Sequence, residues 1–143
     1  MGTYQSVGKN DRIVTVPHIE RAQRALDAAE LLRREGFHAD AACRAHQSTI
    51  HAERALLATA KRSPPTIRDV HRLAEQHFVN PGQVDPAFAE RLGALGSLRS
   101  NIDEQPVGEA DDSQSETALA TARDFLAATR AWIDGHGFGG DES

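Results

Sequence analysis

The chain has 143 residues, of which 39% are hydrophobic, 26% are charged and 5% are aromatic. This length suits one domain with a single core. The few aromatic residues and the many alanines favour closely packed helices over sheets. The only cysteine is Cys43, which excludes an intrachain disulfide and any zinc site built from several thiolates.

Hydropathy and charge limit the cellular compartments and the binding partners that are expected for this protein. In the first 60 residues no aliphatic run approaches the roughly 20 residues that a bilayer span needs, so we expect a cytoplasmic protein without a membrane segment. The net charge of −5 argues against a general nucleic-acid coat. Residues 1–62 carry ten Lys or Arg and seven Asp or Glu, whereas the remainder carries six and fourteen. An anion site is therefore expected in the N-terminal half.

Two long helices are predicted in the N-terminal half of the chain. Residues 1–16 mix glycine, polar and charged residues without periodicity, and we interpret them as a flexible arm. Pro17, a residue favoured in a first helical turn, begins a helix that is predicted to end before Gly36. A second helix is predicted over residues 38–61, and its broad apolar surface makes it the central helix.

Two shorter helices follow the central one. Consecutive prolines end the central helix, and an N-cap at Thr66 predicts a third helix over residues 66–78. Pro86 begins a fourth helix that extends to about residue 102. Gly93 and Gly96 weaken this helix, and we expect them to permit close packing against a neighbouring backbone.

The last helix follows an acidic loop. Residues 113–116 (SQSE) form a predicted capping box and begin a fifth amphipathic helix that ends near residue 133. The glycine-rich residues 134–143 are predicted to be disordered. Because no strand-length alternation competes with these helices, the predicted fold class is all-α, an up-down helical bundle of about five helices over residues 17–133.

Seven histidines raise the question of a metal site. His46 and His51 are five residues apart, so on a helix they point about 140° away from each other, whereas a helical ligand pair needs a spacing of three or four. The six-residue spacing of His71 and His77 is no better suited. We therefore predict no metal site and no cofactor, since a glycine-rich phosphate loop is also absent. Cys43 is interpreted as a small core residue.

The polar residues of the central helix are its most informative feature. Six of them interrupt an otherwise core-like run: Arg44, His46, Gln47, Ser48, His51 and Glu53. A structural interpretation pairs Arg44 with Asp40 at a spacing of four and half-buries the histidines. A functional interpretation is that the cluster binds a nucleotide or a phosphate, or forms a partner interface. Arg99 and Asp103 are also four residues apart, which permits an intrahelical ion pair.

Five segments in a fixed order carry a family resemblance. They are ADAACRAHQSTIHAERALL (39–57), the Pro-Thr step at 65–66, HFVNPGQVD (77–85), LRSNIDE (98–104) and FLAATRAWI (125–133). This pattern of helix lengths and semi-specific positions resembles the HEPN family, in its small stand-alone bacterial and archaeal branch. The resemblance implies an up-down helical bundle, usually a homodimer, that often acts beside a minimal nucleotidyltransferase in toxin–antitoxin-like pairs. Some such proteins are metal-independent endoribonucleases.

The resemblance also assigns positions on the second helix. Arg44 stands where the family has the arginine that precedes an aromatic pair, and His51 stands at the family's histidine. Ala45 and His46 replace the aromatic pair. The second helix therefore keeps the polar positions of the family and lacks its aromatic ones.

On the fourth helix, Arg99 and Asp103 match the arginine and the aspartate of the family's motif, with Glu104 in place of its tyrosine. Ribonuclease members instead need an arginine followed four to six residues later by a histidine, which moves the 2′-hydroxyl proton while the arginine holds the phosphate. Residues 104–106 are Glu, Gln and Pro, so this motif is absent.

We therefore expect a non-catalytic HEPN-like interaction or nucleotide-binding module, partnered with a small nucleotidyltransferase in a toxin–antitoxin-like pair. The alternative is a divergent metal-independent endoribonuclease toxin that acts on RNA, and a generic helical scaffold is a third hypothesis. For the first two hypotheses the candidate functional residues are Arg44, His46, His51, Arg99 and Asp103.

Overall fold

A computed structural model describes residues 9–137, with side chains from residue 15 onward. Over this range the chain forms five α-helices and no strand, which confirms the all-α prediction. A π-helical turn, η1 (Glu75–Val79), directly continues the third helix. The helices are α1 (Lys9–Arg34), α2 (His38–Thr59), α3 (Ile67–Ala74), α4 (Phe88–Glu104) and α5 (Asp112–Gly135).

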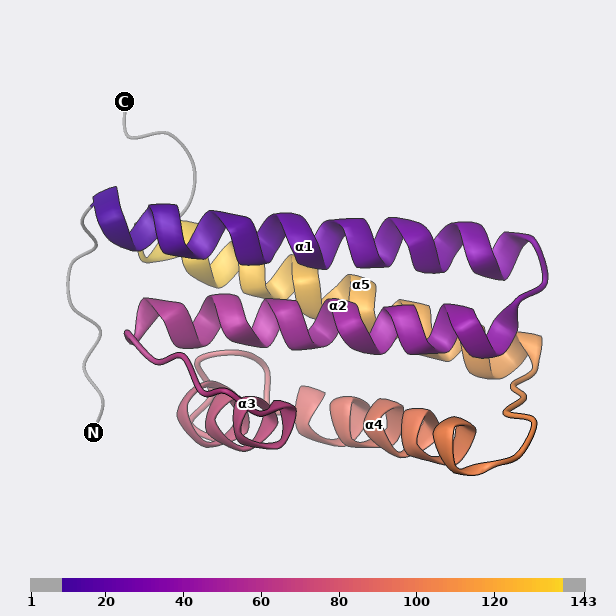
Figure 1. Cartoon of the computed structure of the whole chain (residues 1–143). Helices are drawn as coiled ribbons and strands as arrows, with labels where there is room; N and C mark the ends of the chain where they lie inside the picture. The colour runs from indigo at the N-terminus through magenta and orange to yellow at the C-terminus, as the bar shows by residue number, and fades with distance from the viewer. Residues whose placement is uncertain (1–8, 138–143) are drawn as a thin grey trace.

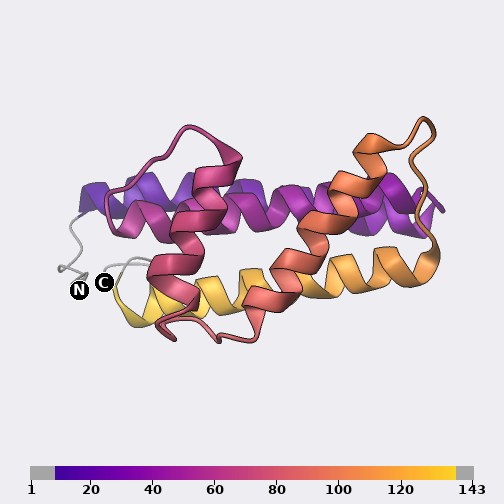
Figure 2. The ribbon, with the colours of Figure 1, turned by 90° about the horizontal axis from the view of Figure 1, so that it is seen from below.

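The helices form a bundle in which α2 is central. α1 runs antiparallel to α2, and α5 lies behind both (Figure 1). α3 and α4 cover the side of α2 that faces away from α1, and they cross the long helices obliquely (Figure 2). Together α3, η1 and α4 replace the third leg of an up-down bundle, so α2 and α5 run in the same direction. None of the described helices is long and apolar enough to cross a membrane.

Alanine explains how closely α1 and α2 approach. Ala22 and Ala29 of α1 and Ala45 and Ala52 of α2 are fully buried. With side chains this small between them, the hydroxyl of Ser48 donates a hydrogen bond of 2.8 Å to the backbone carbonyl of Ala22 on the neighbouring helix. Larger side chains fill the wider space near α5.

Two aromatic pairs lie where η1 and the start of α4 pack against α5. Phe78 meets Trp132 edge-to-face at 5.2 Å, and Phe88 meets Phe125 in the same way at 5.2 Å between ring centroids. Such edge-to-face pairs are the favoured geometry of buried aromatic rings. They anchor η1 and the start of α4 on α5.

α1 begins earlier than the sequence predicted. Residues 9–16 are helical rather than part of a flexible arm, and Pro17 lies inside the helix. An interior proline removes one backbone hydrogen bond and costs about 3 kcal/mol. Thr15, two residues before Pro17, is only 1% exposed, so the packing of this side chain against the core opposes that cost. Residues 1–8 of the predicted arm lie outside the described residues.

The N-terminus of α5 is also displaced from the prediction. Asp111, not Ser113, is the N-cap: its side chain accepts from the backbone N–H of Gln114, and the Gln114 side chain accepts from the backbone N–H of Asp111. Two overlapping capping-box patterns occur in this segment, and the earlier one is used. α5 continues to Gly135, and residues 138–143 of the predicted tail lie outside the described residues.

Candidate functional site

The structure separates the five candidate residues into two groups on different sides of α2. His46 lies near Arg99 and Asp103 of α4, and the charges of both side chains affect the pKa of its imidazole. Arg44 and His51 lie on the side of α1, where His51 is influenced by charges of α1 and α2. The seven-residue spacing of Arg44 and His51 explains their common side, and the five-residue spacing of the two histidines explains their separation.

Three side chains form a buried polar chain between α2 and α3. His71 Nδ1 lies 2.5 Å from Glu53 Oε1 in an ion pair, and His71 Nε2 lies 3.3 Å from His46 Nε2. Glu53 is 2% exposed and His46 is 8% exposed. When His71 is protonated it donates toward both neighbours, so its two nitrogens link a carboxylate to a neutral imidazole.

The protonation of this chain follows from burial and contact. Burial, together with the charges of His71 and Arg99, lowers the pKa of His46 to about 4, against the opposing effect of Asp103. Burial alone would also lower the pKa of His71, but its contact with Glu53 outweighs burial and raises the pKa. Burial raises the pKa of Glu53, against the opposing effect of His71. His46 is therefore neutral at pH 7, and the contact with Glu53 favours the protonated form of His71.

Arg99 is already occupied within the protein. Its Nε donates to Asp103 Oδ2 at 3.0 Å, as the four-residue spacing predicted, and its Nη1 donates to the Cys43 carbonyl at 3.3 Å. The Cys43 thiol is partly buried, and burial raises its pKa, which keeps it protonated and a poor nucleophile. On this side of α2, Arg99 and Asp103 are therefore engaged in contacts within the protein.

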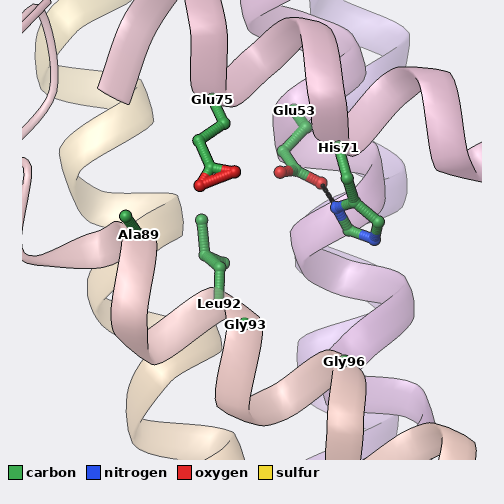
Figure 3. Close-up of a pocket in the computed structure, with 7 residues that line it drawn as sticks. All are labelled: Glu53, His71, Glu75, Ala89, Leu92, Gly93 and Gly96. Carbon is green, nitrogen blue, oxygen red and sulfur yellow. Dashed lines mark ion pairs between the residues drawn. The ribbon is translucent and has the colours of Figure 1, made fainter. Parts of the chain in front are cut away.

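A cavity of about 210 Å³ opens next to Glu53, between α3, η1 and α4. Figure 3 shows the carboxylates of Glu53 and Glu75 facing each other across it, with Leu92 below. Gly93 and Gly96 line it as well, so the prediction that these glycines allow close packing is wrong. No atom lies within 4 Å of where a Cβ of residue 93 would stand, and for residue 96 the nearest is His46 Nε2 at 4.0 Å.

The opposite side of α2 carries a cluster of cations that we call the cationic face. Arg44, His51 and Arg54 follow one another on α2 at helical spacing, and His18 and Arg21 lie on α1 beside them. The face consists of His18, Arg21, Arg44, His51 and Arg54.

The arginines of the cationic face are not paired with a carboxylate in the described part of the chain. Arg44 donates to Gln47 Oε1 at 2.7 Å rather than pairing with Asp40, and Arg54 donates to the Pro64 carbonyl at 3.1 Å. Among the residues with described side chains, no carboxylate forms an ion pair with Arg21, Arg44 or Arg54. By contrast, five arginines elsewhere pair with carboxylates: Arg33, Arg72, Arg91, Arg99 and Arg123.

The two histidines of the cationic face are held neutral. Burial lowers the pKa of His51, and Arg21, His18, Arg54 and Arg44 lower it further; every charge that acts on it is positive. Burial and the charges of Arg21 and Arg54 lower the pKa of His18 in the same way. The Nδ1 atoms of both rings are buried without a hydrogen-bond partner in the described part of the chain. The face thus combines fixed positive charge with unused imidazole nitrogens.

Comparison with known proteins identifies the family. The sequence profile of the HEPN domain matches residues 16–132, which is most of the chain. The protein belongs to the HEPN domain family. The resemblance seen in the sequence is thereby confirmed, and the start of the match at residue 16 falls one residue before Pro17.

Two archaeal relatives carry descriptive names. "Putative toxin MJ0142" of Methanocaldococcus jannaschii is 24% identical over 115 residues, which cover 80% of this chain and 78% of the relative. "Putative toxin MJ0605" of the same organism is 29% identical over 108 residues, which cover 76% of this chain and 80% of the relative. No solved structure matches the chain significantly.

Within this HEPN domain, several residues of the two sites were not singled out by the sequence. The spacing of His71 to His77 gives no sign of the contact with Glu53, and Arg21 lies in a helix whose sequence pattern is amphipathic. Glu53 gave the clearest signal, since it stands seven residues after His46 and therefore on the same buried side of α2. No set of His, Cys, Asp and Glu in the described residues is arranged to hold a metal ion.

Proposed function

We propose that this HEPN protein is the phosphate-binding component of a toxin–antitoxin-like pair and that it binds a nucleotide or RNA on the cationic face without cleaving it. The observation that carries the proposal is that Arg21, Arg44 and Arg54 converge on His51 with no carboxylate among the charges that act on it. Arginine is suited to phosphate because its planar guanidinium donates several hydrogen bonds. The names of the two relatives support the toxin–antitoxin context.

The fourth-helix arginine, on the side of α2 that faces α4, is not available for cleavage. In ribonuclease members of the family the fourth-helix arginine acts with a histidine, but Arg99 is held by Asp103 and by the Cys43 carbonyl. The chain following Arg99 offers carboxylates instead of imidazole, and these repel a polyanion. We therefore assign Arg99 and Asp103 a structural role.

The partner in the proposed pair is a small nucleotidyltransferase, and the HEPN chain itself forms a homodimer. Both parts rest on family membership. Co-expression with a nucleotidyltransferase encoded beside this chain, followed by affinity purification, tests the first part, and failure of the two products to associate would remove it. Sedimentation of the isolated chain at tens of micromolar tests the second, and a monomer there would contradict it.

A second candidate function is a metal-independent endoribonuclease that acts from the cationic face. It is favoured by the two imidazoles, His18 and His51, whose lowered pKa values leave them neutral and able to accept a proton beside three arginines. A base near neutrality and a cation for the phosphate are the groups that 2′-hydroxyl attack requires.

One experiment distinguishes binding from cleavage. A fluorescently labelled single-stranded RNA of about 15 nucleotides is titrated with the protein in EDTA, and the same samples are then run on a denaturing gel. We expect saturable binding with the RNA intact. Arg44→Ala should weaken binding about tenfold, whereas Arg123→Ala, which removes an exposed arginine that pairs with Glu30, should not change it. Cleavage that disappears in His51→Ala with the fold retained would establish the second candidate instead.

A further inference from the structure

The cavity beside Glu53 carries a charge opposite to that of the cationic face. We propose that this cavity binds an alkylammonium group, with the carboxylates of Glu53 and Glu75 as its counter-ions and Ala89 and Leu92 as its apolar wall. This site is separate from the proposed phosphate site, because it lies on the α3 and α4 side of α2.

Glu53 is the first reason to expect a ligand. Its side chain is 2% exposed, and a single ion pair joins one of its oxygens, Oε1, to His71. The second oxygen points across the cavity toward Glu75 (Figure 3). A carboxylate accepts about four hydrogen bonds, and a buried one without donors is costly. An oxygen of a buried carboxylate is thus left facing an open space.

The charge of the lining is the second reason. Three titratable side chains line the cavity, and they are Glu53, His71 and Glu75. With both carboxylates ionised and His71 protonated, their sum is one negative charge, and the charge of Glu75 acts on both Glu53 and His71. An ammonium group has one positive charge and three N–H donors, so it neutralises the excess and supplies the missing donors.

The size and wall of the cavity select a small ligand with an alkyl chain. Its volume of about 210 Å³ is below the roughly 300–1,000 Å³ of sites for larger ligands, which excludes a nucleotide. Gly93 and Gly96 cost helix stability, about 1 kcal/mol each relative to alanine, without bringing another backbone close. Their contribution is to leave the space open. Glu75 is the first residue of η1, and π-helical turns often occur at functional sites.

Two sources can supply this chemistry. One is a free amine in solution, and the other is a lysine side chain of a bound protein, which presents the same ammonium at the end of an alkyl chain. The opening beside the exposed residue Glu75 admits either.

The experiment uses the full chain with methyl-labelled alanine and leucine. Butylamine, butanol and N-acetyl-lysine amide are titrated separately at pH 7 while the methyl resonances of Ala89 and Leu92 are followed by NMR. We expect saturable shifts with the two ammonium compounds and no saturable shift with butanol. Tighter binding of the lysine derivative than of butylamine identifies a protein side chain as the natural occupant, and the reverse order identifies a free amine.

Three variants connect any binding to the cavity. Glu75→Gln removes an exposed carboxylate and should weaken butylamine binding at least fivefold. Gly93→Leu places a side chain into the open space, should abolish binding, and should leave the helix at least as stable. Glu90→Gln is the matched control, because it removes an exposed carboxylate of α4 that does not line the cavity, and it should bind as the wild type does.

Three outcomes would overturn the proposal: equal binding of butanol and butylamine, unchanged affinity in Glu75→Gln, or no saturable shift at tens of millimolar amine. These outcomes leave the proposed phosphate site untouched, since RNA binding is measured on the opposite side of α2 with different variants.

Discussion

The two polar sides of α2 differ in how their charges are balanced. On the side of α3, the negative charge of Glu53 and the positive charge of His71 neutralise each other, and His46 completes the chain as a neutral ring. On the side of α1, Arg44 and Arg54 meet further cations and only neutral hydrogen-bond acceptors. The same helix therefore carries one balanced group and one unbalanced group less than two turns apart.

This difference separates charges that cancel within the fold from charges that do not. Glu53 and His71 neutralise each other, and removing either member leaves an uncompensated charge behind. The further negative charge beside them is that of Glu75 on η1. A group of like charges is unfavourable in the free protein, and binding of a phosphate relieves their repulsion.

The largest effect is expected from His71→Ala, which leaves the buried carboxylate of Glu53 without its cation. Removing one partner of a buried ion pair costs about 3 kcal/mol or more of unfolding free energy. Urea denaturation followed by circular dichroism measures this loss. The control is the double variant Glu53→Gln with His71→Ala, which removes the charge as well and should be more stable than His71→Ala alone. If the double variant is the less stable of the two, the pair is not balanced as described.

The pH dependence of stability should show two limbs. The pKa of His46 is lowered from 6.5 to about 4 in the folded state, so between these values the unfolded chain binds more protons and stability falls as pH decreases. The shift corresponds to about 3 kcal/mol. The pKa of His71 is raised in the folded state, so its contribution is complete below 6.5 and is lost as pH rises through the folded value.

Thermal or urea unfolding between pH 4 and 9 measures both limbs. His46→Leu removes one titrating ring and should make the acid limb less steep while leaving the alkaline limb in place; His18 and His51, whose pKa values are also lowered, account for the remaining slope. An unchanged acid limb in this variant would show that His46 titrates normally in the folded protein.

The cationic face should be visible in the salt dependence of RNA binding. Each phosphate contact contributes about 0.7 to the slope of the logarithm of affinity against the logarithm of salt concentration for single strands. Arg21→Ala with Arg44→Ala should therefore reduce the slope by about 1.4. A parallel double variant, Arg72→Ala with Arg123→Ala, removes two exposed arginines that pair with carboxylates and should retain the wild-type slope. Equal slopes in the two doubles would contradict a localised site.

The smallest effect is expected from Arg99→Ala. An ion pair at this spacing on a partly exposed helix contributes up to about 1 kcal/mol of stability, and less at high salt. RNA affinity should not change, because Arg99 lies on the balanced side of α2. A loss of RNA affinity without a loss of stability would move the binding site to α4.

Helix content and order could be predicted from the sequence because apolar spacing, prolines and caps act locally. The start of α1 could not, because the burial of Thr15 that carries the helix through Pro17 is a tertiary effect. The choice of Asp111 over Ser113 as the N-cap of α5 was equally hidden, since both residues head an acceptable capping box. Local rules thus identified elements better than boundaries.

Part of each candidate site could be predicted from the sequence, because the spacing of residues along one helix is a local property. Spacing alone placed His46 and His51 on different sides of α2 and paired Arg99 with Asp103. A carboxylate in a core-like run, Glu53, signals that a cation must come from elsewhere in the chain, but sequence spacing does not say which helix supplies His71. Pairings across helices depend on packing, and no local pattern encodes them.

The π-helical turn η1 changes the direction in which the side chains after it point. A π turn holds about one residue more than an α turn, so each side chain after it is rotated by about 100° relative to an uninterrupted helix. His71, before the turn, faces Glu53, whereas Phe78 and Val79, the last two residues of the turn, are fully buried. A single helix of constant pitch has one apolar stripe, whereas this segment presents an ionic surface and then an aromatic anchor within nine residues. Deleting Gln76 would restore constant pitch and set the ion pair and the anchor in competition for one orientation.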